Sequence, residues 1–293
     1  MKVAALLTGA TGYLGRNLLH YWLRQGDCDV VCIDRSTGFD FTGHGWERHL
    51  PQHDVDVVIH LAQSRRYRDF PAAAEEMFLV NVASTAALLE WARGHRVKRF
   101  VFASTGTVYV PRPGKLGETA ECAPASMYAA TKLSAELLMH PYSQFFEVVI
   151  ARLFGVYGPG QRQMLIADTI RKVRAGREIL LAGGAGIYLT PLFVDDCVKV
   201  LSALTEVRLE QACTVVNVAA DDLLSLGEIV QEIARQLRIR PVTRTTEDPP
   251  QYVCGDNTRL KVLYRDDFLP FRTGLARMLQ DESHEGPEGV KCQ

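Results

Sequence analysis

Three glycines near the start of the chain constrain its fold most. Gly9, Gly12 and Gly15 follow the apolar run 2–7 and precede the stretch 13–24, whose apolar residues recur at helical spacing. A turn that passes directly from a buried strand into a helix needs glycine, because side chains would block both the turn and the approach of a phosphate to the backbone. The sequence therefore predicts a strand–turn–helix unit whose helix N-terminus binds phosphate.

Further apolar runs alternate with helical patterns along the first 220 residues. The runs are rich in Val, Ile, Leu and Phe and show little polar alternation, as in strands covered on both faces. The predicted strands are 2–7, 29–34, 55–61, 98–104, 146–152 and 214–218, and the predicted helices are 13–24, 72–94, 126–140, 161–175, 195–206 and 224–238. This order predicts an α/β fold, a Rossmann-type doubly wound parallel sheet with helices on both faces.

Composition excludes several classes of protein. Lys and Arg number 33 and Asp and Glu 34, whereas a general nucleic-acid binder carries a basic excess. No apolar run approaches the roughly 18 residues of a membrane helix, and the apolar start is too short for a signal peptide. The seven cysteines form no CxxC pair and no Cys/His cluster at zinc spacing. This pattern predicts no metal site and reduced thiols in a cytoplasmic protein.

Asp34 strengthens the phosphate-site interpretation. It ends the second apolar run, about 20 residues past the glycines, where a carboxylate accepts hydrogen bonds from an adenosine ribose. A carboxylate there repels a 2′-phosphate, which favours NAD over NADP as the cofactor. Arg35 follows directly and can reverse this preference, so NADP stays open as the less favoured cofactor.

Tyr128 and Lys132 form the second chemical signal. They stand four residues apart at the start of the predicted helix 126–140, so they share one helix face. A phenol with an ordinary pKa near 10 is a poor base at neutral pH, but a neighbouring ammonium lowers that pKa. Such a pair can take a proton from a substrate hydroxyl while hydride leaves the same carbon.

On these motifs the chain resembles the NAD-dependent epimerase/dehydratase family, the nucleotide-sugar branch of the extended short-chain dehydrogenases/reductases. Residues 8–15 resemble the family's TGxxGxxG, and Tyr128 and Lys132 its catalytic pair. Further matching segments are Val58–Ala62 (VIHLA), Asn81-Val82, Phe102–Tyr109 (FASTGTVY), Arg152–Pro159 (RLFGVYGP) and Phe193–Asp196 (FVDD). The resemblance covers nearly the whole chain.

The resemblance implies roles for individual residues. The implied catalytic residues are Tyr128, Lys132 and Thr105, whose hydroxyl bonds the reacting oxygen. The implied cofactor-binding residues are Gly9, Thr11, Gly12, Tyr13, Leu14, Gly15, Asp34, Arg35, Asp40, Leu61, Ala62, Gln63, Asn81, Ser104, Tyr128 and Lys132. The implied substrate-binding residues are Arg65, Ser104, Thr105, Tyr128, Tyr157 and Arg162.

Two positions bear on the reaction type. In the family's 4,6-dehydratases an Asp-Glu pair precedes the VYG segment, whereas Gly106 and Thr107 stand there in this chain. The resulting hypothesis is an epimerase acting at C4 of a nucleotide-linked sugar. One alternative is a net NAD(P)-dependent dehydrogenase or reductase of a sugar or another hydroxyl or carbonyl compound. A second is a non-catalytic NAD-sensing binding protein, whose relatives typically lose the Tyr/Lys pair.

The chain departs from the family where relatives bind the substrate diphosphate. Gly155 replaces the Asn of RxxNVYGP, and 188–191 read YLTP without the usual arginine. Residues 245–248 (TTED) replace an Arg-Pro-Gly-Asp-like element, and Val110 replaces the glycine of VYG. Either other cations take over, with Arg65, Arg66, Arg162 and Arg171 as candidates, or the substrate is not a usual nucleotide diphosphate sugar.

The resemblance also implies a domain organisation. Residues 1–155 plus 187–220 are expected to form an NAD-binding Rossmann domain, and 156–186 plus 221–280 a smaller, mainly C-terminal substrate-binding region. The polar tail 281–293 is expected to be flexible. In relatives the helices corresponding to 72–94 and 126–140 form a homodimer. The apolar residues compatible with such an interface include Met77, Leu88, Leu133 and Leu137.

Overall fold

Six parallel strands form the central sheet of the computed structural model, which describes residues 3–26 and 28–281. Their order across the sheet is β2-β1-β3-β4-β5-β8. The strands are β1 (Val3–Thr8), β2 (Cys28–Ile33), β3 (Val57–His60), β4 (Arg99–Thr105), β5 (Glu147–Leu153) and β8 (Cys213–Val218). Each corresponds to a strand predicted from the sequence, so the doubly wound α/β fold is confirmed. The predicted flexible tail lies, from residue 282 on, outside the described residues.

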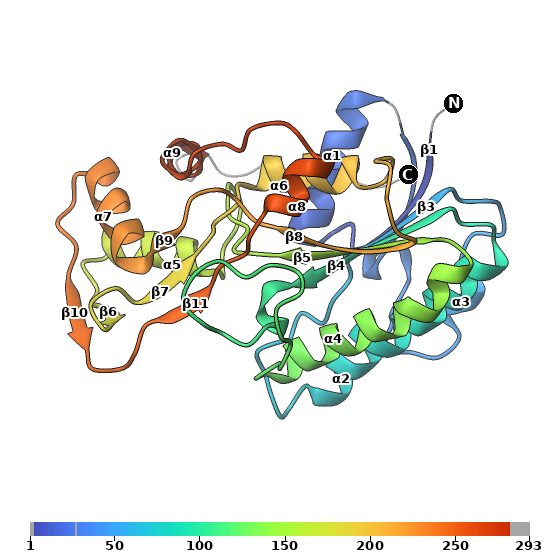
Figure 1. Ribbon diagram of the computed structural model, residues 1–293, viewed down its shortest axis with the longest axis horizontal. Helices are drawn as coiled ribbons and strands as arrows, with labels where there is room; N and C mark the ends of the chain where they lie inside the picture. The colour runs from blue at the N-terminus through green and yellow to red at the C-terminus, as the bar shows by residue number, and fades with distance from the viewer. Residues whose placement is uncertain (1–2, 27, 282–293) are drawn as a thin grey trace.

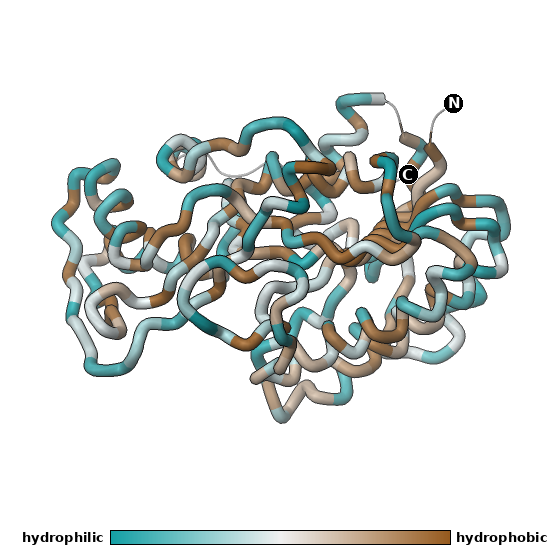
Figure 2. The backbone as a smooth tube through the Cα atoms, viewed as in Figure 1, coloured by the Kyte–Doolittle hydropathy of each residue, from teal (hydrophilic) through white to brown (hydrophobic). Residues whose placement is uncertain are grey.

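Burial explains why these segments are strands. Every residue of β3 and β4 is buried, since helices cover both faces of the sheet. Figure 2 shows the strongly apolar strands at the centre, between helices that mix polar and apolar residues. The register pairs Thr8 with His60 and Thr105 with Leu153, so the strands end along one common edge. The turns that leave this edge carry most of the predicted site residues.

Different helices cover the two faces of the sheet (Figure 1). On one face α1 (Tyr13–Gln25) packs against α6 (Val194–Ala203). The other face carries α3 (Ser84–Gly94) and α4 (Met127–Met139), with α2 (Ala74–Phe78) beside α4. Short 3-10 turns occur at η1 (Arg35–Thr37), η2 (Trp46–His49), η4 (Gly106–Val108) and η5 (His140–Gln144).

The predicted helix 72–94 is not one regular helix. A π-helical turn, η3 (Leu79–Ala83), separates α2 from α3. The hydroxyls of Ser84 and Thr85 donate to the carbonyls of Val80 and Asn81, backbone oxygens within this turn. Apolar periodicity does not reveal such a turn, because one widened turn barely changes which residues face the core.

A smaller region extends beyond the carboxyl edge of the sheet, at the left of Figure 1. It has its own apolar core, in which Ile170, Ile233 and Leu275 are fully buried. Its elements are α5 (Leu165–Arg174), β6 (Ile179–Ala182), β7 (Ile187–Leu189), β9 (Leu224–Ser225), α7 (Leu226–Leu237), β10 (Thr243–Thr246), β11 (Gln251–Val253) and α9 (Phe271–Asp281). A capping box of Ser225 and Glu228 opens α7.

This region differs from the expected division of the chain. β7 pairs with β11 and β9, so it lies in the smaller region although 187–220 were expected in the Rossmann part. Conversely, α8 (Thr258–Leu263) places Leu260 in the core between the sheet and α1 and α6. The helix expected at 161–175 begins only at Leu165. None of the helices in the described part is long and apolar enough to span a bilayer.

A buried histidine connects the sheet to the helices of the second face. His60 Nδ1 lies 2.6 Å from the hydroxyl of Thr8, and Nε2 lies 2.9 Å from that of Thr85. The Thr85 hydroxyl donates its proton to the Asn81 carbonyl, so His60 Nε2 donates and Nδ1 accepts. Burial, followed by the charge of Lys132, lowers the pKa of His60 to about 3. The imidazole is therefore neutral at physiological pH.

The first prediction concerns acid stability. Between pH 6.5 and about 3 the unfolded chain protonates this histidine and the folded chain does not. Protons therefore favour unfolding, and His60 should reduce the free energy of unfolding by up to about 1.4 kcal/mol per pH unit as the pH falls through this window. Urea unfolding from pH 7 to 4.5 should give a flatter pH dependence for His60→Gln than for the wild type. The control is His20→Gln, at an exposed position of α1. Equal slopes in wild type and His60→Gln would contradict the assignment.

Candidate active site

The glycine turn leads from β1 into α1 and closely approaches the chain leaving β3. Gly9 has a φ of 73°, and a Cβ there would lie 2.8 Å from the Ala62 nitrogen. A Cβ on Gly15 would collide with the Gly9 carbonyl oxygen. Gly12 is the N-cap of α1 and provides no side-chain cap, and the first turn of the helix contains no acid. The helix N-terminus thus presents its N–H groups without a competing carboxylate, as a pyrophosphate requires.

Asp34 lies beside this turn and is almost fully buried. Its carboxylate accepts hydrogen bonds from the backbone N–H of Thr11, at 3.1 Å, and of Ser36, at 2.7 Å. It also caps the 3-10 turn η1 together with Thr37. These bonds fix the carboxylate against the glycine turn. The two carboxylate oxygens can accept further hydrogen bonds in addition to these. Ribose hydroxyls are the donors that suit this position.

Arg35 and Asp40 lie further out. The Arg35 guanidinium is half-exposed and lies 4.0 Å from the Glu76 carboxylate. Asp40 is exposed, and hydrogen bonds from the backbone and hydroxyl of Thr42 lower the pKa of its carboxyl. Both residues are accessible to a ligand, and their contact with a cofactor stays a prediction.

The chain after β3 passes directly beneath the glycine turn. The backbone N–H groups of Leu61 and Ala62 donate to the carbonyl and the hydroxyl of Thr8. Gln63 follows and is exposed, and its Oε1 accepts a hydrogen bond from the Tyr128 hydroxyl at 3.0 Å. This short segment therefore connects the cofactor turn to the expected catalytic tyrosine.

Asn81, an expected cofactor contact, uses its side chain to connect protein segments, and its contact with a cofactor stays a prediction. Its side chain is fully buried, its oxygen accepts from the Ser64 backbone N–H at 2.9 Å, and its nitrogen donates to the Thr131 hydroxyl at 2.9 Å. Since both ends of the amide are used, Asn81 positions the loop after β3 against α4.

The expected catalytic residues come together where β4 ends and α4 begins. Thr105 is the last residue of β4, and its oxygen caps η4 by accepting from the Thr107 N–H. Ser126 caps α4, which places Tyr128 in the first turn and Lys132 one turn further. The Thr105 hydroxyl lies close enough to the Tyr128 hydroxyl to lower the pKa of that phenol. The Lys132 ammonium is buried and lies 3.9 Å from the centre of the Phe102 ring.

Burial dominates the protonation of this pair. Burial raises the pKa of Tyr128, the Tyr67 hydroxyl raises it further, and the Thr105 hydroxyl lowers it. Burial lowers the pKa of Lys132 to about 7, and the Glu136 carboxylate opposes this. Tyr128 is therefore a neutral phenol that donates to Gln63 at neutral pH. Before it can accept a substrate proton, it must exchange this bond for donors that stabilise its phenolate.

Two residues expected to line the substrate pocket do not do so. Tyr157 has no exposed surface, because its ring packs against Phe193 and Phe271 and its hydroxyl donates to the Phe271 carbonyl. Ser104 is buried, and its hydroxyl donates to the Glu136 carboxylate. Both residues belong to motifs at the edge of the site. Some side chains of each motif face the site, whereas those of Ser104 and Tyr157 face the core.

A ring contact with Tyr128 was not predicted from the sequence. The Tyr67 and Tyr128 rings lie 5.2 Å apart, and the Tyr67 hydroxyl reaches the Met164 sulfur at 3.4 Å. Arg68 Nη1 donates to the Gln163 carbonyl at 2.9 Å. The loop after β3 thus bridges to the loop before α5, which carries the exposed Arg162. Only the position of the RRYR run, directly after a strand at the cofactor edge, gave a signal for this bridge.

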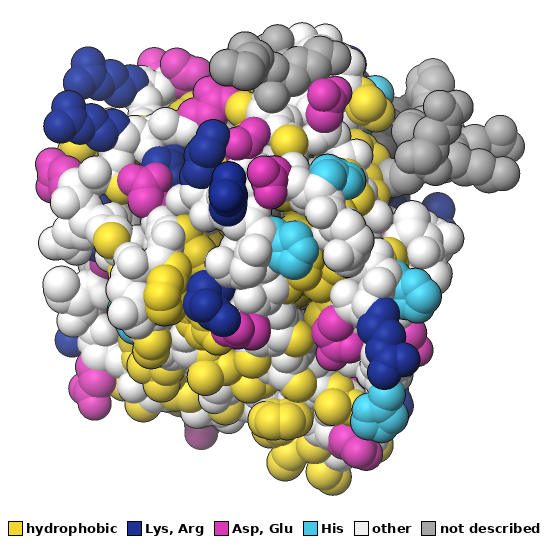
Figure 3. Space-filling view, turned by 90° about the vertical axis from the view of Figure 1, so that its right-hand side faces the viewer, with side chains coloured by type: hydrophobic (Ala, Val, Ile, Leu, Met, Phe, Trp, Pro, Cys, Tyr) yellow, Lys and Arg dark blue, Asp and Glu magenta, His cyan; other side chains and the backbone are white. Residues whose placement is uncertain are grey.

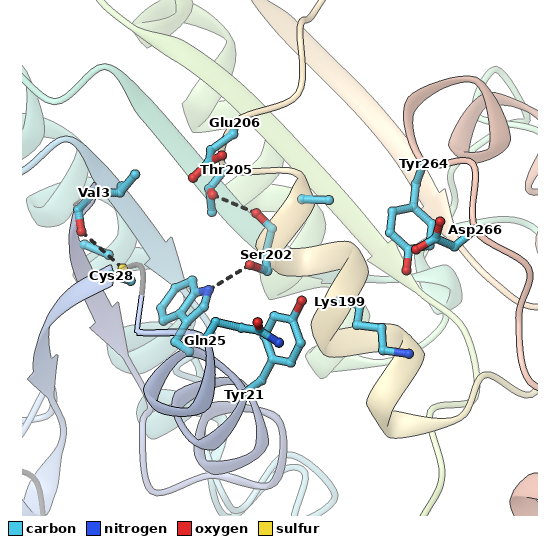
Figure 4. Close-up of a pocket in the computed structure, with 13 residues that line it drawn as sticks. Val3, Tyr21, Gln25, Cys28, Lys199, Ser202, Thr205, Glu206, Tyr264 and Asp266 are labelled. Atoms are coloured by element: carbon cyan, nitrogen blue, oxygen red, sulfur yellow. Dashed lines mark hydrogen bonds between the residues drawn. The ribbon is translucent and has the colours of Figure 1, made fainter. Parts of the chain in front are cut away.

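A cavity of about 260 Å³ lies elsewhere, between α1 and α6 (Figure 4). Val3 and Cys28, which line it, begin β1 and β2, so the cavity lies at the amino ends of these strands. The glycine turn and Thr105 lie at the opposite, carboxyl edge. In the described residues no group of three or more His, Cys, Asp or Glu side chains is arranged to hold a metal ion.

Comparison with known proteins agrees with this geometry. The sequence model described as NAD dependent epimerase/dehydratase family matches residues 5–219. The chain belongs to this family. The match covers the whole central sheet with its glycine turn, Asp34, and the Thr105, Tyr128 and Lys132 positions.

Individual relatives show the same likeness. A Bacillus subtilis (strain 168) protein named as an uncharacterized UDP-glucose epimerase, YtcB, is 32% identical over 235 residues, covering 70% of this chain and 72% of that protein. The structure of MoeE5 in complex with UDP-glucuronic acid and NAD has a TM-score of 0.82 and 27% identity, covering 96% and 99% of the two chains. A UDP-glucuronic acid 4-epimerase from Bacillus cereus shares the fold at a TM-score of 0.84, 23% identity and 97% and 99% coverage.

The second prediction tests the glycine turn. Gly15→Ala places a methyl group against the Gly9 carbonyl, so the turn must open and NAD affinity should fall at least about tenfold. Gly94→Ala is the matched control, because a Cβ there meets nothing within 4 Å. Calorimetric titration with NAD measures both variants. Unchanged NAD affinity in Gly15→Ala would show that the turn does not hold the cofactor.

Proposed function

We propose that this protein is an NAD-dependent epimerase that inverts C4 of a nucleotide-linked sugar. The observation that carries the proposal is the meeting of Thr105, Tyr128 and Lys132 beside the glycine turn. Family membership and relatives named as UDP-sugar epimerases support it. An acid–base pair next to a hydride carrier is the equipment for oxidising and re-reducing a secondary alcohol.

The structure of the segment after β4 argues against dehydration. A dehydratase of this family needs carboxylates at the positions of Gly106 and Thr107. A Cβ on Gly106 would collide with the Phe154 ring, which leaves no room for an acid. The Thr107 hydroxyl lies 3.0 Å from that of Thr105 and extends its hydrogen-bond chain. Hydroxyls can orient a substrate oxygen, but they cannot supply the acid and base that expel water.

The proposed reaction uses the residues in sequence. Tyr128, with its phenolate stabilised by Thr105 and the Lys132 ammonium, takes the proton of the C4 hydroxyl. NAD held by the glycine turn and Asp34 would supply a reversible acceptor for the C4 hydride. The 4-keto sugar then rotates within the cleft, so that C4 receives the hydride on its opposite face. Tyr128 returns the proton to the oxygen, and no net change of the cofactor results.

Asp34 supports NAD as the cofactor over NADP. Its buried carboxylate, fixed by Thr11 and Ser36, would lie against a 2′-phosphate with no compensating bond. Crystallised neighbours described as complexes with NAD support the same choice. The remaining cofactor contacts expected from the sequence, including Tyr13, Leu14, Arg35 and Asp40, are part of this proposal.

The substrate would lie between the carboxyl edge of the sheet and the smaller region. Arg65 and Arg162 are exposed on the two loops that Arg68 connects, and both can reach an anion there. Arg171 and Arg66 are less suited, because they pair with Asp168 and Asp69. Relatives whose names specify UDP-sugars make a uridine diphosphate sugar the first substrate to test.

The third prediction tests the reaction. The protein with NAD should interconvert a UDP-sugar and its 4-epimer without net change in absorbance at 340 nm. Tyr128→Phe should lower this conversion by roughly 10²- to 10⁴-fold, because the variant lacks the hydroxyl that transfers the proton. Chromatography of the sugar nucleotides measures conversion across UDP-, GDP-, dTDP- and CDP-sugars.

The control for this experiment is Tyr21→Phe, at the distant cavity between α1 and α6. It should epimerise like the wild type. Stoichiometric production of reduced cofactor with any alcohol would replace the proposal by the net-oxidoreductase alternative, which the missing diphosphate arginine at Tyr188–Pro191 favours. NAD binding without turnover of any sugar would favour a sensing role.

We also propose a homodimer through the α2–α4 layer. Phe78, Leu137, Leu138 and Phe145 expose 38–61% of their surface on α2, α4 and the turn after η5. Figure 3 shows apolar side chains gathered on the lower part of one face of the molecule, on the side of these helices. Exposed apolar groups that cluster in this way mark interaction sites. Met77 and Leu88, expected at the interface, are instead buried within the protomer.

The fourth prediction tests this interface. Leu137→Arg should convert the dimer to a monomer, because a charge would be buried against the partner's apolar face. Val262→Arg is the control, since Val262 is similarly exposed (68%) but lies on α8. Light scattering after size exclusion measures the mass of each. A monomeric wild type, or a dimeric Leu137→Arg, would refute this interface.

A cytoplasmic location completes the proposal. The six cysteines in the described part of the chain are all free thiols. Free thiols persist in reducing compartments such as the cytoplasm.

A further inference from the structure

A buried layer of charge lies directly beneath the reaction centre, and the proposed reaction uses only one of its members, Lys132. Glu136 stands four residues after Lys132 on α4, so the two side chains share one helix face. Phe102 and Ser104, two apart on β4, face this helix: the Lys132 ammonium lies over Phe102, and the Ser104 hydroxyl donates to Glu136. Both charged groups are about 98% buried.

Arg152 supplies the third charge of this layer. It stands opposite Ser104 in the register of β4 and β5 and donates to both oxygens of Glu136, with Nη2 at 2.6 Å. Its guanidinium also lies 4.6 Å from the centre of the Tyr109 ring. Its remaining nitrogen, Nη1, is buried without a hydrogen-bond partner among the residues the structure describes.

The Glu136 carboxylate is therefore paired with the Arg152 guanidinium, and the Lys132 ammonium lies one helical turn away on the same face of α4. The other titratable neighbours carry no charge at neutral pH: burial lowers the pKa of His60 on β3 to about 3, and burial raises the pKa of Tyr109, Cys122 and Cys213. Arginine does not release its proton in proteins, whereas a buried lysine does so readily. A change in the charges of this layer should therefore change the pKa of Lys132.

We propose that Glu136 and Arg152 are opposing positioning residues for the Tyr128–Lys132 pair: Glu136 keeps the Lys132 ammonium charged, and Arg152 limits how strongly it does so. The Ser104 bond and the two bonds from Arg152 fix the carboxylate in place. The inference rests on the proposed function, in which the charge on Lys132 stabilises the Tyr128 phenolate. It assigns to Glu136 and Arg152 an effect on the protonation of Lys132, in addition to their structural role as a buried ion pair.

The opposing roles predict opposite effects. In Glu136→Gln the two cations repel each other without an anion, so Lys132 should titrate about one pH unit lower or more. In Arg152→Met no guanidinium neutralises the Glu136 carboxylate, which then stabilises the Lys132 ammonium more strongly. Lys132 should therefore titrate higher by a similar amount. Loss of packing in a damaged core would not move the same lysine in two opposite directions.

The fifth prediction is tested on the full chain labelled with [ε-¹³C]lysine. The pH titration of the Lys132 ε-carbon signal, assigned through Lys132→Arg, gives the midpoint for each variant. Glu147→Gln is the matched control, because it removes an ion pair with Arg99 at the amino end of the same sheet. Its Lys132 midpoint should equal that of the wild type. Far-UV circular dichroism confirms that each variant is folded.

Arg152→Met keeps the test decisive if Glu136→Gln does not fold. Failure of its midpoint to rise overturns the proposal, as do midpoints that move in the same direction in both variants. Glu136→Asp, which restores the charge, should bring the midpoint back toward that of the wild type.

The titration requires no substrate, so its failure is distinguishable from failure of the proposed function. Opposite shifts in a chain that converts no sugar nucleotide would leave the charge layer established and the epimerase refuted. Conversion that depends on Tyr128, with unmoved midpoints, would refute only the role of Glu136 and Arg152. In the active protein, Glu136→Gln should move the acid limb of the turnover–pH profile to higher pH, because Tyr128 loses the charge that stabilises its phenolate.

Discussion

The close approach of the glycine turn to the chain leaving β3 is the contact on which the site depends. Gly9 lies against the Ala62 backbone, and Thr8 accepts hydrogen bonds from Leu61 and Ala62 with its carbonyl and its hydroxyl. Because this segment continues to Gln63, which bonds Tyr128, the position of the cofactor turn and that of the acid–base residue are not independent. Asn81 and the neutral His60 tie the same segment to the helices behind it. The backbone, not the substrate loops, sets the geometry of the reaction centre.

The sequence was sufficient for features that depend on local pattern. The six strands of the central sheet, the glycine turn and the capping box at Ser225 are each determined by a few adjacent residues, whose periodicity or size leaves few alternatives. Tyr128 and Lys132 could be placed together because helical spacing alone puts them on one face. The short strands of the smaller region could not be found in this way, because β6, β7, β10 and β11 have only three or four residues and follow no alternating pattern.

The side-chain errors have another origin. Ser104 and Tyr157 lie in motifs that border the site, and whether such a residue faces the ligand or the core depends on partners far away in the sequence. Glu136 lies 32 residues from Ser104, and Phe271 lies 114 from Tyr157. The bridge from Tyr67 and Arg68 to Gln163 and Met164 likewise joins loops about 95 residues apart. No local rule gives these contacts, and they decide which residues remain available to a substrate.

Burial by the fold does not by itself produce the charged forms of Tyr128 and Lys132 that the reaction needs. Burial makes Tyr128 a weaker acid and Lys132 a weaker base, so at rest each moves toward its neutral form. A phenolate–ammonium pair needs charges placed against this tendency, and in a dry site each added charge acts strongly. Glu136 is the anion on the same helix face as Lys132, and it is shared with Arg152, which cannot discharge. The tyrosine can therefore rest as a neutral phenol that donates to Gln63, and it ionises only when ligand binding adds positive charge beside it.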